Sequence, residues 1–233
     1  MFGHVRAICF DLDDTLWPCV PVIRAAEAHC YAWLQREAPR LTERYAPDDL
    51  RAHRIEFGRR QPQIAHDLSE VRLRSLAALL EDAGYPVALA RGANDAFRDA
   101  RNRVTPYPDV LDGLARLRGR YTLVSVTNGN AQIERTPLHA SFDLSLTAAE
   151  VGAARPDPAM FHTASAHTGV PLEAFLHVGD DPERDVEAAR RVGMSTVWVN
   201  RDDNSWPPHL RPADLEVHDL AGLVENLDQS PSV

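Results

Sequence analysis

The sequence contains no lysine, so all 25 of its basic residues are arginines, and 34 acidic residues leave a formal net charge of −9. Proteins that bind nucleic acid need a basic patch or stripe that neutralises phosphates, and an acidic chain without one is a poor candidate. We therefore expect no nucleic-acid partner. Any site in this protein that needs a fixed positive charge must use arginine.

Cysteine is also scarce, and long hydrophobic runs are absent. The three cysteines, Cys9, Cys19 and Cys30, are an odd number whose spacing matches neither a disulfide framework nor a zinc site. No apolar run approaches the roughly 18–20 residues that cross a bilayer, and the N-terminal segment turns acidic where a signal peptide needs apolar residues. We expect a cytoplasmic protein with reduced thiols and no membrane partner.

Hydrophobic residues make up 44% of the 233 residues, which is typical of a folded globular protein. Apolar runs rich in β-branched or aromatic residues predict strands at residues 5–10, 121–127, 175–178 and 195–199, and a weaker one at 142–146. Helical patterns lie between the later runs, at residues 110–117, 159–168 and 183–192. Apolar strands that alternate with helices predict the α/β class, with a Rossmann-like parallel sheet covered on both faces.

Residues 17–105 contain no convincing strand and differ from the rest of the chain. Helical patterns fit at residues 22–37, 47–58, 64–83 and 86–103. The sequence thus predicts an all-helical domain of residues 17–105, inserted into an α/β domain formed by residues 1–16 and 106–233. The insert holds 14 arginines against 12 acidic residues, whereas the remainder is strongly acidic. Such a balance suits a small anionic substrate between the two domains.

The strongest chemical signal is the run of residues 10–17, Phe-Asp-Leu-Asp-Asp-Thr-Leu-Trp, at the end of the first predicted strand. The carboxylates of Asp11, Asp13 and Asp14 repel one another when they are crowded at a buried strand end. A bound cation removes that cost, and Mg²⁺ prefers oxygen ligands. Two carboxylates in different environments can also serve as nucleophile and proton donor. The run favours a metal-assisted phosphoryl-transfer site over a merely acidic turn.

Three later segments carry weaker signals. Residues 127–130, Thr-Asn-Gly-Asn, follow a predicted strand and offer a hydroxyl and backbone N–H groups that suit a phosphate, although Asn-Gly is also a common turn. Arg155 stands just before a predicted helix, where a plain helix start would also fit. The strand at 175–178 is followed by Gly-Asp-Asp; Asp181 can cap the next helix, which leaves Asp180 as a metal ligand.

The order of these motifs resembles that of the haloacid dehalogenase-like hydrolase superfamily, and the helical insert resembles its C1 cap. The resemblance implies that Asp11 is the nucleophile that forms an aspartyl-phosphate. It implies that Asp13 protonates the leaving alkoxide and then activates water. Because a halide leaves without a proton, the acid at Asp13 favours a phosphatase over a dehalogenase. Arg155 stands where the family usually has lysine, and we expect it to take over that role.

The same resemblance implies the ligands of the phosphate and of the metal. Mg²⁺ is expected on the carboxylates of Asp11 and Asp180 and on the backbone carbonyl of Asp13, with Asp185 as a nearby or water-mediated partner. The phosphoryl oxygens are expected to contact residues from two segments, Leu12 in the first and Thr127, Asn128 and Gly129 in the second, with the backbone near Asn128 donating to them.

The whole pattern is similar to the bacterial subgroup of phosphatases that act on FMN and 5-amino-6-(5-phosphoribitylamino)uracil. This similarity implies a small phosphorylated metabolite as partner, with His66 and Arg72 of the cap as substrate-binding candidates and Trp17, Tyr31 or Trp33 available to stack on a ring. Two alternatives stay open: a sugar-phosphate or nucleotide phosphatase of the same fold, and a catalytically impaired ligand-binding homologue. Both a monomer and a homodimer are compatible with the sequence.

Overall fold

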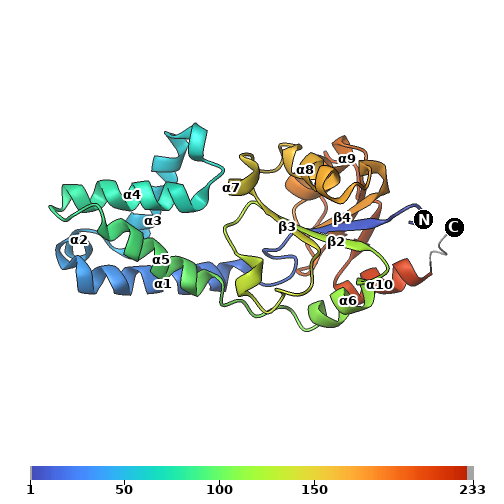
Figure 1. Ribbon diagram of the computed structural model, residues 1–233, viewed down its shortest axis with the longest axis horizontal. Helices are drawn as coiled ribbons and strands as arrows, with labels where there is room; N and C mark the ends of the chain where they lie inside the picture. Colours follow the sequence, from blue (N-terminus) through green and yellow to red (C-terminus); the bar gives the residue numbers. More distant parts are fainter. Residues whose placement is uncertain (1, 230–233) are drawn as a thin grey trace. The chain divides into compact units, whose positions relative to one another are not determined.

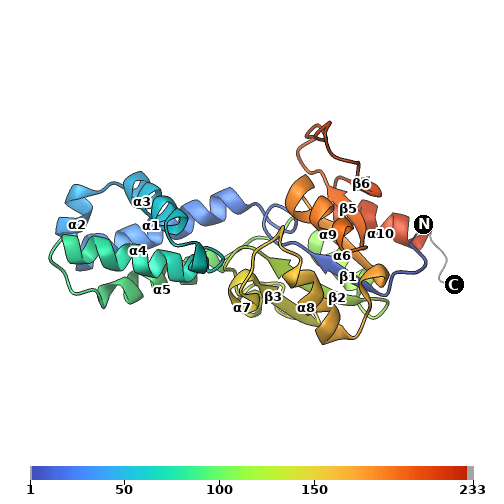
Figure 2. The same ribbon diagram turned by 90° about the horizontal axis from the view of Figure 1, so that it is seen from above.

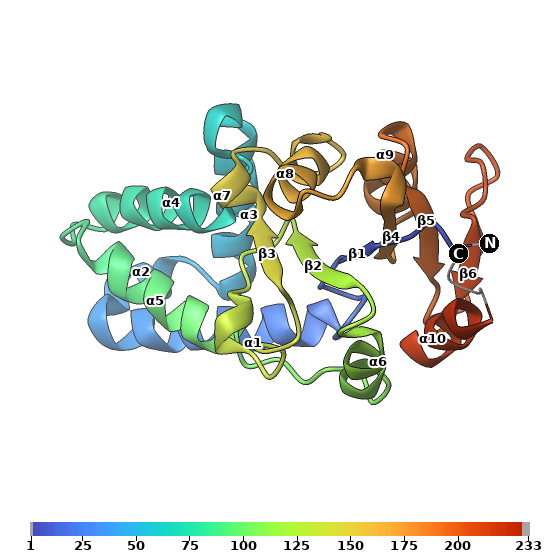
Figure 3. The same ribbon diagram turned by 45° about the vertical axis from the view of Figure 1, so that its right-hand side comes forward.

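The order of the strands places the start of the chain in the middle of the sheet. In the computed structural model, which describes residues 2–229, six parallel strands run in the order β3-β2-β1-β4-β5-β6 (Figure 3). They are β1 (Ala7–Phe10), β2 (Thr122–Thr127), β3 (Leu144–Thr147), β4 (Phe175–Gly179), β5 (Ser195–Val199) and β6 (Leu215–Val217). Because the chain builds outward from β1 first on one side and then on the other, a topological switch point lies between β1 and β4. Ligands of such sheets bind at this point, beyond the carboxyl ends of the strands.

Helices cover both faces of this sheet, which explains why β1 is apolar throughout. Its four residues are fully buried. Ala7 and Cys9 share one core cluster with Met160 and Phe161 of α8. Figure 1 shows α8 and α9 on that face and α6 and α10 on the other. The core helices are α6 (Val110–Leu117), α7 (Ala148–Val151), α8 (Ala159–Thr168), α9 (Ala188–Arg191) and α10 (Leu220–Asp228), with short helical turns at Ile133–Arg135 (η2), Leu172–Ala174 (η3) and Pro182–Glu187 (η4).

The chain divides into two compact units, which we call the core and the cap. The core comprises the described residues of Met1–Pro18, Thr105–Asn128 and Ile133–Val233, and the cap comprises Cys19–Val104 and Gly129–Gln132. The cap is all-helical: α1 (Cys19–Glu37), α2 (Pro39–Arg44), α3 (Pro47–Arg59), η1 (Pro62–Ile64), α4 (Leu68–Asp82) and α5 (Leu89–Arg101). None of the described helices is both long and apolar enough to cross a membrane.

Within the cap, α5 packs against α1 and α4 (Figures 1 and 2). Leu34, Leu80 and Phe97, from the three helices, lie in one buried cluster. A close approach occurs at Gly92 of α5, where a Cβ atom would lie 2.4 Å from the ring of Trp33. Trp33 is thus part of the packing between α1 and α5, which argues against its predicted role in stacking on a substrate ring.

The sequence predicted the α/β fold correctly, and the errors lie at element ends and in short elements. The predicted helix at 64–83 begins at Leu68, because the Asp67 carboxylate caps it by accepting from the backbone N–H groups of Ser69 and Glu70. Among the helices and strands, those not predicted were α2, α7, β6 and α10, each of nine residues or fewer. Short elements present too few residues for a hydrophobic period to stand out.

The segment Gly129–Gln132 also differs from the predicted domain boundaries, which placed it in the α/β domain. Its contacts lie with the cap: the backbone N–H of Gln132 donates to Asn102 Oδ1 at 2.8 Å, and Asn130 Nδ2 donates to Ser69 Oγ at 3.1 Å. These hydrogen bonds join positions distant in sequence, so the pattern around residues 127–130 could not show them.

A single ion pair joins three parts of the core. The two terminal nitrogens of Arg201 lie 3.1 and 2.9 Å from the carboxylate oxygens of Asp109, and Arg201 Nε donates to the Thr15 carbonyl at 3.0 Å. Asp109 also accepts from the backbone N–H of Leu220 at 2.8 Å, which ties the start of α6 to the start of α10. Burial raises the pKa of Asp109, but the hydrogen bonds from Arg201 and Leu220 outweigh burial, so the pKa lies below its usual value.

We expect Asp109→Asn to lower the free energy of unfolding at pH 7 by about 1–3 kcal/mol, because two charge-assisted hydrogen bonds are lost. The pKa of Asp109 is lower in the folded state than in the unfolded state, where it is about 3.9. Its stabilisation is therefore present above that pH and is lost as the pH falls through the folded-state pKa. Urea unfolding at pH 7 and at low pH measures both effects. Asp112→Asn, on the exposed side of α6, is the control; an equal loss in both variants, or a loss independent of pH, would contradict this account.

Candidate functional site

The candidate site lies at the carboxyl ends of β1, β2 and β4, next to the switch point. Asp11 directly follows β1, and its backbone N–H donates to the Val178 carbonyl of β4 at 2.9 Å. Asp180 directly follows β4, and Thr127 is the last residue of β2. Parallel pairing of these strands brings together residues that are more than a hundred positions apart in the sequence.

Three carboxylates gather there. One oxygen from each of Asp11, Asp180 and Asp185 lies within 4.8 Å of the other two. Burial raises the pKa of Asp11 well above its usual range; Arg155 opposes this shift, and the carboxylates of Asp185 and Asp180 add to it. Burial and the Asp185 carboxylate likewise raise the pKa of Asp180, to about 7. Crowded oxygen ligands whose charges repel one another fit a hard divalent cation such as Mg²⁺.

The three carboxylates are not equivalent. Asp185 Oδ1 accepts from Arg155, and Asp185 Oδ2 accepts from the backbone N–H of Asp181 at 2.9 Å. Burial alone would raise the pKa of Asp185, but Arg155 and the hydrogen bond from His177 lower it to about 2. Because both of its oxygens already have protein partners, Asp185 fits the predicted role beside the metal better than a place among its direct ligands.

Gly179, the last residue of β4, makes room for Asp185. A Cβ atom at this position would lie 2.3 Å from Asp185 Cγ, a distance that no side chain could adopt without displacing the carboxylate. The predicted role of Asp181 as a helix cap is confirmed, since its carboxylate accepts from the backbone N–H groups of Glu183 and Arg184, both at 2.9 Å. In the turn of residues 179–181, Gly179 therefore leaves space for the Asp185 carboxylate, Asp180 belongs to the carboxylate cluster, and Asp181 caps the helical turn that follows.

Arg155 is the fixed cation of the site. Its side chain is 3% exposed, and it forms ion pairs with both Asp11 and Asp185. Burial lowers the pKa of Arg155, but these two carboxylates raise it above its usual value, so the guanidinium stays charged. The planar guanidinium binds Asp185 and Asp11 through two different nitrogens. The ammonium group of a lysine has a single nitrogen and could not divide the two contacts in this way.

Asn128 positions Arg155. Its Oδ1 accepts from the backbone N–H of Arg155 at 2.8 Å, and its Nδ2 donates to the Arg155 carbonyl at 2.9 Å. The Asn128 side chain is thus engaged with the backbone of Arg155, whereas the predicted phosphate contact at this position is its backbone N–H. Of the other predicted phosphate ligands, Leu12 has a buried side chain, and Gly129 belongs to the cap.

The loop after β1 orients Asp13. Trp17 Nε1 donates to Asp13 Oδ1 at 2.8 Å, and Asp14 reverses the chain with φ = 60°. Trp17 is fully buried, so the prediction that it stacks on a substrate ring is wrong. Thr15, which sequence reasoning did not select, donates to Asp180 Oδ1 at 3.1 Å and lies 3.4 Å from Asp11 Oδ2.

His177 is a further residue that sequence reasoning did not place in the site. It is fully buried in β4, its Nε2 lies 3.1 Å from Asp185 Oδ1, and the edge of its ring packs on Phe161 with centroids 4.9 Å apart. Burial lowers the pKa of His177, so the ring is neutral. The one signal available was a histidine inside an otherwise apolar strand.

The two cap residues predicted to bind substrate differ in exposure. His66 is partly buried and directly precedes Asp67, the N-cap residue of helix α4, whereas Arg72 lies within α4 and is 8% exposed. Arg72 stacks on Phe97, with its guanidinium carbon 3.4 Å from the ring centroid. Their predicted roles toward a substrate remain predictions.

Comparison with known proteins gives consistent results. The model of the haloacid dehalogenase-like hydrolase family matches residues 5–193. The 5-amino-6-(5-phospho-D-ribitylamino)uracil phosphatase YigB of Escherichia coli is 34% identical over 230 residues, 95% of this chain and 96% of that protein. The phosphoserine phosphatase of Thermus thermophilus is 31% identical over 93% and 96%. A crystal structure described as a 2-haloacid dehalogenase from Pseudomonas syringae matches with a TM-score of 0.90 and 36% identity, over 97% and 99% of the chains.

The chain therefore belongs to the haloacid dehalogenase-like hydrolases. Within that family it is a phosphatase, a phosphoric monoester hydrolase similar to the enzymes from E. coli and T. thermophilus.

We expect Gly179→Ala to lower phosphatase activity at least tenfold, because the new Cβ displaces Asp185 from its contacts with Arg155 and the Asp181 N–H. Phosphate release and the thermal midpoint Tm are measured together. Gly222→Ala in α10 is the control, since its Cβ would meet no atom closer than 3.5 Å. Full activity in Gly179→Ala would show that the close approach of Asp185 is not needed.

Proposed function

We propose that the protein hydrolyses small phosphomonoesters with the help of Mg²⁺, through an aspartyl-phosphate on Asp11. The observation that carries the proposal is the cluster of Asp11, Asp180 and Asp185, in which Asp11 and Asp185 pair with one fixed cation, Arg155. Catalysis of phosphoryl transfer depends mainly on positioning and on neutralising the charge of the transferred group. A buried arginine and a set of carboxylates suited to a divalent cation provide both.

In the proposed first step, an Asp11 carboxylate oxygen attacks phosphorus, and the bond from phosphorus to the leaving alkoxide oxygen breaks. Asp13 gives its proton to that alkoxide, so the alcohol leaves neutral. In the second step Asp13 takes a proton from water, whose oxygen attacks phosphorus and releases phosphate, and the Asp11 carboxylate is restored. The hydrogen bond from Trp17 to Asp13 Oδ1 orients the carboxyl group for both transfers.

Other residues of the site bind and orient the phosphoryl group in this proposal. Arg155 neutralises charge on the phosphoryl oxygens, while Thr127 and the backbone N–H groups of Leu12 and Asn128 donate hydrogen bonds to them. Mg²⁺, when bound, would lie on Asp11, Asp180 and the Asp13 carbonyl and would neutralise the charge between the nucleophile and the phosphate. Thr15 holds Asp180 through its hydroxyl.

Asp13 supports hydrolysis of a phosphate ester rather than of a carbon–halogen bond. An alkoxide is a strong base that needs a proton as it leaves, whereas a halide needs none. The crystal structure described as a 2-haloacid dehalogenase matches over almost the whole chain, so dehalogenation is the natural competing activity. The test is direct: we expect no halide release from 2-chloropropionate under conditions in which phosphomonoesters are hydrolysed.

For the substrate we propose FMN or 5-amino-6-(5-phosphoribitylamino)uracil, with sugar phosphates and nucleotides as the alternative. The similarity to the E. coli 5-amino-6-(5-phospho-D-ribitylamino)uracil phosphatase over 95% of this chain supports the first choice. In the same proposal the cap residues His66 and Arg72 contact the substrate. We place the enzyme in the cytoplasm, as a monomer or homodimer.

We expect Asp11→Asn to abolish phosphate release from every ester in a panel that includes FMN, the ribitylaminopyrimidine phosphate, sugar phosphates and nucleotides. The reason is that an amide neither attacks phosphorus nor neutralises a divalent cation. Activity of the unchanged protein should require Mg²⁺ and disappear with EDTA. Asp14→Asn is the matched control, because asparagine also tolerates the left-handed backbone at this position; it should retain most of the activity. Turnover by Asp11→Asn would exclude the covalent mechanism.

Replacing Arg155 tests whether this arginine does the work of the family's usual lysine. We expect Arg155→Lys to retain measurable turnover and Arg155→Met to lose about 10²–10³-fold in kcat, since methionine leaves the phosphoryl group without its cation. Circular dichroism shows whether each variant is folded. If the unchanged protein binds phosphate but hydrolyses none of the panel, the alternative of an impaired ligand-binding homologue is correct instead.

A further inference from the structure

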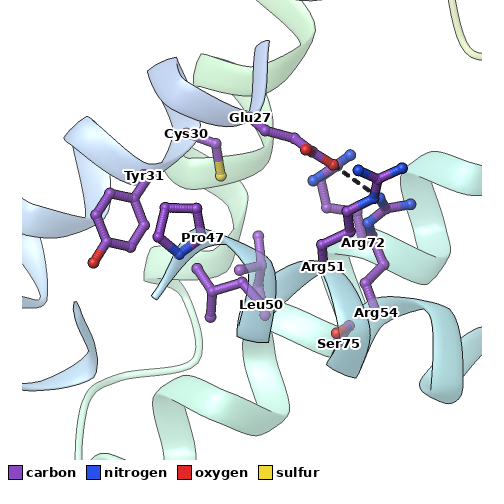
Figure 4. A pocket seen from close by; sticks show the side chains of 10 residues that line it. Glu27, Cys30, Tyr31, Pro47, Leu50, Arg51, Arg54, Arg72 and Ser75 are labelled. Carbon is purple, nitrogen blue, oxygen red and sulfur yellow. Dashed lines mark hydrogen bonds and ion pairs between the residues drawn. The ribbon is translucent and has the colours of Figure 1, made fainter. Parts of the chain in front are cut away.

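The cap contains a pocket of its own, separate from the carboxylate cluster of the core. It lies between α1, α3 and α4 (Figure 4). Three of its ten lining residues are arginines, and one is acidic. The lining residues are Glu27, Cys30, Tyr31, Pro47, Leu50, Arg51, Arg54, Arg72, Ser75 and Leu76.

The charges of this pocket are not balanced by its own residues. Arg54 pairs with Glu27 at 3.0 Å, so the one carboxylate of the lining is already engaged. The charges of Arg51 and Arg72 then have no acidic residue left among the lining. Figure 4 shows the three guanidinium groups gathered on the side of the pocket where Glu27 lies.

Arg72 carries the strongest indication of a missing partner. Its side chain is more than nine-tenths buried, and its Nε has no hydrogen-bond partner within the part of the chain that the structure describes. Its guanidinium stacks on Phe97, a contact that leaves the N–H groups at the edge of the plane free of the ring. Burial and the nearby charge of Arg54 lower the pKa of Arg72 to about 9. A buried cation without a counter-ion is costly, and an anion in the pocket would remove that cost.

The opposite side of the pocket is apolar. Pro47 and Leu50 lie there with apolar side chains (Figure 4), and the Tyr31 hydroxyl is already hydrogen-bonded, with the backbone carbonyls of Thr42 and Tyr45 each at 3.2 Å. Ser75 Oγ is likewise engaged, 2.8 Å from His53 Nδ1. The groups left for a ligand are therefore guanidinium N–H donors on one side and an apolar wall on the other.

We propose that this pocket binds a small organic anion, in which a carboxylate or phosphate group contacts Arg51 and Arg72 and a compact apolar body lies against Leu50 and Tyr31. Guanidinium groups bind such oxyanions through paired hydrogen bonds. The site does not depend on the proposed phosphatase mechanism, because it belongs to the cap alone.

The test is a calorimetric titration of the whole protein with benzoate, with phenylphosphonate as the phosphate-like probe and with benzamide as the uncharged counterpart. We expect saturable binding of at least one of the two anions and none of benzamide. Arg72→Met should weaken anion binding about tenfold or more, because it removes a charge-assisted contact while keeping a side chain of similar length. Arg74→Met, on the same helix but exposed and paired with Glu70, is the matched control and should leave binding unchanged.

The anion can be part of the substrate or a separate ligand, and kinetics distinguish the two. If it is part of the substrate, Arg51→Met should raise KM about tenfold for a phosphomonoester that carries a carboxylate, such as phosphoserine, and not for phenyl phosphate. If it is a separate ligand, Arg51→Met should leave both KM values unchanged while it weakens the binding of benzoate or phenylphosphonate.

The proposal is wrong if neither anion binds saturably, if benzamide binds equally well, or if Arg72→Met and Arg74→Met weaken binding to the same extent. Arg51→Met is the second variant should Arg72→Met fail to fold, as shown by circular dichroism. The proposed phosphatase activity is measured separately with phenyl phosphate, so failure of the cap pocket and failure of the phosphatase proposal give different results.

Discussion

Burial of Arg155 between Asp11 and Asp185 is the interaction on which the core site depends. Removing a charge from water costs several kcal/mol, so a buried arginine must be held by carboxylates, and these carboxylates need it in turn. One cation cannot balance three acids, and burial together with the neighbouring carboxylates raises the pKa values of Asp11 and Asp180. The proposed requirement for Mg²⁺ and the fixed position of Arg155 thus have the same electrostatic origin.

The residues that maintain this ion pair come from β4 and from the loop after β2. Asn128, after β2, forms hydrogen bonds with the backbone of Arg155, and His177, within β4, forms one with the Asp185 carboxylate. Gly179 leaves the space that the Asp185 carboxylate occupies. None of these three needs to touch a substrate to matter. Together they fix the position of the Arg155 guanidinium relative to the carboxylates of Asp11 and Asp185. A bound phosphoryl group would have to fit this arrangement.

The cap presents the opposite electrostatic situation. In the core site, three carboxylates accompany a single arginine, Arg155. In the cap pocket, three arginines stand against a single carboxylate, Glu27. The first arrangement suits a divalent cation and the second suits an organic anion. In a chain without lysine, both tasks that need a fixed positive charge fall to arginine, whose planar group can serve two partners at once.

The sequence by itself determined the α/β class and the helical insert, and it placed Asp11, Thr127 and Asp180 at the ends of strands. It could do so because the periodicity of hydrophobic residues and the polar residues at strand ends are local properties of the sequence. Only the tertiary structure decided which side chains are engaged with the protein and which remain for a ligand. It assigned the Asn128 side chain to Arg155, buried Trp17, brought His177 to Asp185, and left Arg72 of the cap with a buried nitrogen that has no hydrogen-bond partner among the described residues. The physical reason is that hydrogen bonds and ion pairs between distant segments depend on packing geometry, which no local pattern of residues records.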